Sequence, residues 1–164
     1  MSPLIESRVT LRGAARDDVE FLARLYSDTR RREVTAWGWP EAQQSTFLRM
    51  QFEAQSRSYR EGFPKAADRI ICLDGSPVGR LMVDHEPRGM RLVDIAVLEE
   101  HRNRGIGGWL IGRLIEECAT RSHTLRLHVR RDNPAIRLYR RLGFTETAAD
   151  EMYLQMERNP LERP

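Results

Sequence analysis

A glycine-rich segment flanked by arginines, Arg102 to Gly108, has the composition best suited to chemistry. Glycines let backbone N–H groups approach a ligand closely, and the N-terminus of a following helix adds about half a positive charge. Arg102 and Arg104 can neutralise further negative charge on a phosphate. The segment predicts a site for a phosphate-bearing ligand, although a tight strand-to-helix connection would also use such glycines.

Two common phosphate-binding motifs do not fit this segment. A G-x-G-x-x-G dinucleotide loop belongs near the first strand of a parallel βαβ unit, whereas Gly105, Gly107 and Gly108 lie past the middle of the chain. A P-loop needs Gly-Lys followed by Ser or Thr, and Lys65 is the only lysine. A different structural context must therefore position the glycines.

The hydrophobic pattern predicts the strand before these glycines and the helix after them. Leu110, Leu114 and Cys118 recur at helical spacing. Asp74-Gly75 predicts a hairpin turn, and Gly143 is expected to end a later helix in the left-handed conformation. The expected order is β-α-α-β-β-β-α-β-α-β-β, with strands over 8–13, 69–73, 78–83, 91–98, 124–129, 144–147 and 151–156, and helices over 15–26, 41–59, a stretch after 108, and 134–142.

Two segments resemble the GNAT acetyltransferase superfamily. Residues 94–107, DIAVLEEHRNRGIG, are similar to the family's strand and its R/Q-x-x-G-x-G/A pyrophosphate loop. Residues 133–144, NPAIRLYRRLGF, are similar to its segment with an asparagine, a Leu-Tyr pair and a closing Gly-Phe.

The resemblance implies the α/β (α+β) GNAT fold, in which a mixed, mostly antiparallel central sheet splays between its fourth and fifth strands and about four helices flank it. We expect a single domain over residues 1–164. The resemblance makes residues 69–156 the cofactor-binding core and leaves residues 1–65 as the variable acceptor side.

The same resemblance implies an acyl-CoA-dependent N-acyltransferase that moves acetyl from acetyl-CoA to a primary amine by direct attack in a ternary complex. The backbone of Ile95, Ala96 and Val97 would then pair with the pantetheine arm, and Asn133 would contact the cofactor nearby. The pyrophosphate would be held by Arg102, Asn103, Arg104, Gly105, Ile106, Gly107 and Gly108. The alternative is a non-catalytic acyl-CoA-binding or regulatory module of the same fold.

Tyr139 and Asp94 are the candidate catalytic residues. The resemblance places Tyr139 near the thioester sulfur, where a phenol can contact the cofactor and protonate the departing thiolate; packing on its helix face is the alternative role. Asp94 is the first candidate for the general base, because a carboxylate beside a partly buried cleft can have a raised pKa. A purely structural carboxylate is its alternative, and the other candidate bases are His85, Glu99, His128 and a water chain.

Trp37 and Trp39 are the candidate acceptor-binding residues. They lie between the first two expected helices, and aromatic faces attract ammonium groups. Anchoring the second helix onto the core is an equal alternative. The acceptor is expected to be a small-molecule amine or an amino group of a peptide or protein, and a homodimer is a further expectation without an assigned interface.

The composition excludes several other classes of protein. The chain has 164 residues, 40% hydrophobic, and its apolar runs fall far below the roughly 18–20 residues that cross a bilayer, so we expect no membrane partner. The 27 basic residues are interleaved with 24 acidic ones, which argues against a nucleic-acid partner. The histidines and cysteines lack zinc-site spacing, so no metal is expected. Cys72 and Cys118 are expected to be buried thiols, and with no apolar leader they predict a cytoplasmic protein.

Overall fold

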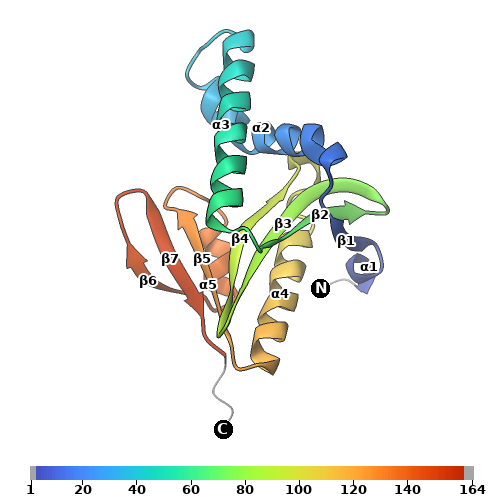
Figure 1. Cartoon of the computed structure of the whole chain (residues 1–164), viewed down its shortest axis with the longest axis vertical. Coiled ribbons are helices and arrows are strands. Elements are labelled where there is room, and N and C mark those ends of the chain that lie inside the picture. Colours follow the sequence, from blue (N-terminus) through green and yellow to red (C-terminus); the bar gives the residue numbers. More distant parts are fainter. Residues whose placement is uncertain (1–2, 161–164) are drawn as a thin grey trace.

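A seven-stranded mixed sheet with helices on both of its faces forms the structure (Figure 1). The computed structural model describes residues 3–160. The strands are β1 (Val9–Gly13), β2 (Ala67–Leu73), β3 (Ser76–Glu86), β4 (Gly89–Val97), β5 (Thr124–Arg130), β6 (Thr145–Ala149) and β7 (Tyr153–Arg158). The helices are α1 (Pro3–Glu6), α2 (Val19–Thr35), α3 (Glu41–Gly62), α4 (Ile106–Thr120) and α5 (Ile136–Arg141), with 3-10 turns at Arg16–Asp18 and Glu99–His101.

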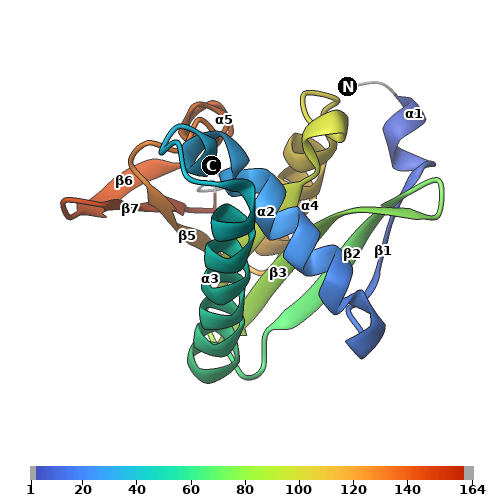
Figure 2. The ribbon, with the colours of Figure 1, turned by 90° about the horizontal axis from the view of Figure 1, so that it is seen from above.

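The strand order is β1-β2-β3-β4-β5-β7-β6, and β4 with β5 forms the only parallel ladder among the described strands. Successive side chains of a strand point to opposite faces of the sheet. On β5, Leu125, Leu127 and Val129 are buried in the core with residues of α4 and α5, so Arg126 and His128 point to the other face. Figure 2 shows α2 and α3 on that other side of the sheet.

The parallel ladder is short, and this opens the sheet. Its last pair is Leu92 with Leu127, yet β4 continues to Val97 and β5 to Arg130 with no further pairing between them in the described chain. The register of β3 with β4 shifts next to Val93, which is a β-bulge. The mixed, mostly antiparallel sheet, splayed between its fourth and fifth strands, is therefore confirmed. The C-terminal part of β4, residues 93–97, has a free edge on the side of β5.

The order of the expected elements is confirmed, although most of their bounds shift by a few residues: β3 extends to Glu86, α3 to Gly62 and β7 to Arg158. Three further differences concern α2, α1 and α5. Helix α2 begins at Val19, after the 3-10 turn, rather than at residue 15, and it continues to Thr35 rather than ending at residue 26. In its polar second half Val34 is fully buried, and Arg30 binds both the Tyr26 hydroxyl and Glu33. The short helix α1 was not expected. Helix α5 begins at Ile136, because Asn133 and the following proline form a turn before it.

Gly143 has a φ of 86° and ends α5 as expected. Within residues 3–160, no helix combines the length and apolar character that a membrane span requires.

Candidate active site

The loop between β4 and α4 presents free backbone amides. Asn103 and Gly105 have φ values of 59° and 85°, and left-handed residues in a tight turn direct neighbouring N–H groups into one concavity. The first N–H groups of a helix also lack intrahelical acceptors. Between residues 3 and 160, no backbone carbonyl accepts a hydrogen bond from the N–H groups of residues 103–108. These amides, with the positive end of the α4 dipole, have the arrangement that suits an anion, and we refer to them as the amide cradle.

Arg102 holds this loop in place from outside the cradle. Its Nε donates to the Val97 carbonyl at 2.8 Å, and its Nη2 lies 3.4 Å from Asp28 on α2. The same Asp28 carboxylate accepts the Glu99 N–H at 2.7 Å. The guanidinium of Arg102 thus ties the loop to β4 and α2, whereas Arg104 is exposed and has no ion pair in the described chain.

Tyr139 lies on α5, beside the start of α4. Its neighbour Leu138 comes within 3.6 Å of the position that a Cβ on Gly108 would take. The Tyr139 ring is 5% exposed and 5.7 Å from the ring of Phe144. Burial, reinforced by the charge of Asp94, raises the pKa of Tyr139 to about 12, so the phenol keeps its proton at neutral pH. Asn133 lies in the turn before α5, where its side chain accepts the Ala135 N–H at 2.9 Å.

Asp94 lies on the free-edged part of β4, on the sheet face that α2 and α3 cover. Met82, its partner on β3, occupies the same face. The Asp94 side chain is 23% exposed. Burial raises its pKa to about 6, with Arg80 opposing the shift and Asp68 adding to it. A carboxyl group with that pKa is mostly ionised at neutral pH and can accept a proton.

Arg80 and Asp68 hold a fixed charge beside Asp94. Arg80 donates to both carboxylate oxygens of Asp68 at 2.8 Å, and its Nη1 lies 3.9 Å from Asp94 Oδ2. Its guanidinium lies 5.3 Å from the ring centroid of Tyr59 on α3, and burial raises the pKa of that phenol. Sequence analysis missed this cluster. An arginine inside the buried run of residues 78–83 was the available signal, because such a charge needs a partner.

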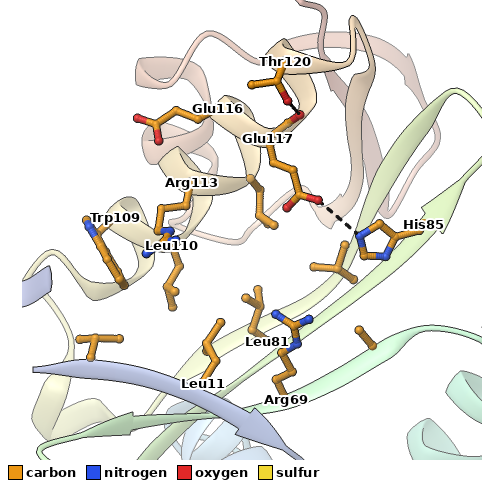
Figure 3. Close-up of a pocket in the computed structure, with 14 residues that line it drawn as sticks. Leu11, Arg69, Leu81, His85, Trp109, Leu110, Arg113, Glu116, Glu117 and Thr120 are labelled. Carbon is orange, nitrogen blue, oxygen red and sulfur yellow. Dashed lines mark hydrogen bonds and ion pairs between the residues drawn. The ribbon is translucent and has the colours of Figure 1, made fainter. Parts of the chain in front are cut away.

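The other candidate bases are distributed over the molecule. His85 lies on the opposite face of the sheet, 3.9 Å from Glu117, at one end of a groove of about 590 Å³ between α4 and strands β1 to β3 (Figure 3). Glu99 forms an ion pair with Arg32 of α2. Only His128 shares the face of Asp94, and burial, with Arg91 adding to the effect, lowers its pKa.

Trp37 and Trp39 contact each other and Phe47, with ring centroids 5.1, 5.3 and 5.5 Å apart. Phe47 lies near the start of α3 and Tyr59 near its end, so about 18 Å of helix separates this cluster from the Arg80 site. The tryptophans pack the α2–α3 connection against the first turns of α3. Their expected contact with an acceptor stays a prediction.

The fold matches solved acetyltransferase structures. PaiA N-acetyltransferase from Thermoplasma acidophilum, in complex with coenzyme A, superposes with a TM-score of 0.68 at 16% identity, covering 92% of this chain and 98% of that one. The ribosomal-protein-S18-alanine N-acetyltransferase from Escherichia coli gives a TM-score of 0.58 at 20% identity, with 92% and 93% covered. At these identities, the similarity shows the fold alone.

Comparison of the sequence with known proteins shows the family to which the chain belongs. The L-amino acid N-acetyltransferase AaaT of Escherichia coli (strain K12) is 32% identical over 97 residues, which are 55% of this chain and only 60% of that protein. A family model described as "Acetyltransferase (GNAT) family" matches residues 21–144, about three quarters of the chain and all of β2 to β5 with the amide loop. The chain therefore belongs to the GNAT family of acetyltransferases.

Proposed function

We propose that this protein is an N-acetyltransferase that moves acetyl from acetyl-CoA to a primary amine, by direct attack within a ternary complex. One observation carries the proposal: the free amides of residues 103–108 follow the end of β4, whose final stretch, residues 93–97, has an open edge because its pairing with β5 stops at Leu92. An anionic tail and an extended arm can be held there together. The coenzyme A bound to the similar PaiA structure supports this choice of donor.

The residues present fit such a donor. The amide cradle and Arg104 suit a pyrophosphate, and Arg102 keeps the cradle in shape. The free edge of β4 over Ile95, Ala96 and Val97 suits the peptide-like amides of pantetheine, since an extended segment can add to an open strand edge. Along a strand, the N–H and C=O groups of successive residues point to opposite edges. The Leu98 N–H donates to the Val78 carbonyl on β3, and Ala96 is paired with Arg80 there, so Ala96 faces β3 while Ile95 and Val97 face the open edge. The Val97 carbonyl already accepts Arg102, so Ile95 and the Val97 N–H supply the remaining edge contacts.

Asp94 and Tyr139 supply the proton transfers in this proposal. The amine nitrogen forms a bond to the acetyl carbonyl carbon, and the carbon–sulfur bond breaks. Asp94 accepts the proton that the amine gives up, directly or through a water molecule. Tyr139 donates its phenolic proton to the departing thiolate and regains one from solvent. The raised pKa values of both groups leave each in the protonation state that its role needs.

The similarity to an L-amino acid N-acetyltransferase makes free amino acids the first acceptors to test. Both cysteines are buried and free, which accords with a reducing compartment, so we keep the cytoplasm as the proposed location.

The test is release of the CoA thiol from acetyl-CoA when an amine is added. We expect release that saturates with amine and an N-acetylated product in equal amount. Binding of acetyl-CoA without release for any amine of a broad panel would instead favour the non-catalytic acyl-CoA-binding module.

A further inference from the structure

Two arginines lie side by side near the end of the β4–β5 ladder, where the two strands begin to separate. Arg91 on β4 and Arg126 on β5 are paired positions of the parallel ladder, one residue before its last pair. Both lie on the face of Asp94, because their neighbours Leu92 and Leu127 are buried in the core on the other face. At most about 10 Å of strand separates Arg91 from Asp94, since three residues of a strand span that length.

These arginines lack hydrogen-bond acceptors. Glu86 lies between them, 3.8 Å from Arg91 Nε and 3.6 Å from Arg126 Nε, which is ion-pair distance but too long for a hydrogen bond. Both Nε atoms are buried and have no hydrogen-bond partner in the described chain. An unsatisfied buried donor is costly, and a guanidinium fork matches the two oxygens of a carboxylate.

A small cavity adjoins the pair. Its volume is about 100 Å³, above what one water needs. It is lined by Arg91, Arg126, Leu127, His128, Gln155, Met156 and Glu157. Glu157 is the β7 partner of Arg126 in the sheet register, yet no ion pair joins them. Burial, with Arg91 adding to the effect, lowers the pKa of His128, so the two arginines rather than this imidazole supply the positive charge at the cavity.

Arg91 is also held in position. Its guanidinium lies 5.7 Å from the ring centroid of Phe63, which follows α3. Tyr59 from the same helix covers Arg80 beside Asp94. The end of α3 therefore covers Arg80 beside the candidate base, and Phe63 just after it covers Arg91 of the arginine pair. An acceptor bound under this end of α3 would reach from the pair toward Asp94.

We propose that Arg91 and Arg126 bind a carboxylate of the acceptor, so that the substrate is a free α-amino acid whose amine lies toward Asp94. The inference rests on the proposed acetyl transfer and deepens it. A peptide or protein N-terminus carries an amide where the free amino acid carries its carboxylate. The arginine pair therefore selects free amino acids against N-terminal amines.

The test compares acceptors that differ only at this group. L-leucine, L-leucinamide and isoamylamine form one series, and L-phenylalanine, L-phenylalaninamide and phenethylamine a second, each assayed by CoA release. We expect kcat/KM for the acid to exceed that for the amide by about 10- to 100-fold, the size of a charge-assisted hydrogen-bond pair. The amide's amine is less basic and more of it is unprotonated, so this comparison is biased against the expected result.

Substitutions then test whether the two arginines cause the preference for the acid over the amide. Arg126→Gln should lower kcat/KM for the acid about 10- to 100-fold, mainly through KM, and leave the amide unchanged; Arg126→Lys should lie between. Arg113→Gln is the matched control, an exposed arginine of α4 that stacks on Trp109 on the opposite face. Arg91→Gln repeats the test if Arg126→Gln does not fold.

The outcomes separate the two proposals. Acetylation of acid and amide at equal efficiency, or an equal loss for both in Arg126→Gln, overturns the carboxylate site while acetyl transfer stands. No release from any amine overturns the transfer itself. Calorimetry in the presence of CoA then decides the carboxylate site alone, because N-acetyl-L-leucine should bind at least about tenfold more tightly than its amide, and equal binding rejects the site.

Discussion

Tyr139 combines a buried ring with a hydroxyl that makes no hydrogen bond within residues 3–160. Tyr139→Phe keeps the ring packing against Phe144 and removes only the proton donor. We expect kcat to fall about 100-fold or more, as for loss of a general acid, while the Kd for acetyl-CoA stays the same. Tyr26→Phe is the matched control, since its hydroxyl binds Arg30 away from the proposed chemistry. Equal turnover in Tyr139→Phe and the unchanged protein would remove Tyr139 from the mechanism.

Asp94 should set the acid limb of the pH profile. A general base works ionised, so kcat should fall about tenfold per pH unit below about pH 6 and level off above it. The ammonium group of the acceptor gives a separate rise at higher pH. Asp94→Asn should lower kcat and abolish only the limb near pH 6. A limb that persists in Asp94→Asn would assign the base elsewhere, with His128 the remaining candidate on that face.

Asp68 offers a finer test of the same group. Its charge raises the pKa of Asp94, and it also occupies Arg80, which opposes that shift. Asp68→Asn removes the first effect and frees Arg80 for Asp94, so both changes move the acid limb below pH 6. Asp74→Asn, at an exposed carboxylate bound to Arg8, should leave the limb in place. If the acid limb of Asp68→Asn stays near pH 6 or moves to a higher pH, the proposed role of the Asp68–Arg80 ion pair is contradicted.

At the scale of elements, the loop before α4 depends on one backbone conformation. Gly105 has a φ of 85°, and a Cβ there would lie 3.1 Å from Ile5 Cδ1. Gly105→Val should therefore distort the amide cradle and weaken acetyl-CoA binding about tenfold or more, measured by calorimetry. Gly112→Ala, later in α4 with open space around it, should leave the affinity unchanged. An unchanged Kd in both Gly105→Val and Arg102→Ala would reject this loop as the pyrophosphate site.

Local patterns in the sequence predicted the elements well. The hydrophobic pattern and the turn residues predicted every strand of the sheet, and the glycines placed the start of α4 within a few residues of Ile106. The polar second half of α2 was missed, because it has only one apolar side chain, Val34, and one buried residue makes no helical pattern. The role of Arg102 was predicted only in part, because local sequence does not show its partners. Its partners, Val97 and Asp28, become neighbours only when α2 packs across the end of β4.

At the scale of the whole molecule, strand pairing creates the site. Arg80 meets Asp68 because β2 and β3 form a hairpin, and Arg91 meets Arg126 because β4 and β5 run parallel across a helix crossover. The spacing of Arg91 and Arg126 in the sequence does not reveal that they are neighbours in the sheet. The same pairing ends after Leu92, which frees the β4 edge beside the amide cradle. The open edge proposed for pantetheine, and the candidate base Asp94 that lies on that part of β4, therefore depend on where one short parallel ladder stops.

The most direct test of this site is the unfolding temperature with acetyl-CoA, with CoA and with ATP. A ligand at about 100 times its Kd stabilises the folded state by about 2.7 kcal/mol. For a domain of this size that corresponds to a rise of roughly 5–10 °C. We predict such a rise with acetyl-CoA and with CoA, and none with ATP. No rise with either form of the coenzyme, at concentrations up to the millimolar range, would contradict the assignment of the splay and its amide loop as an acetyl-CoA site.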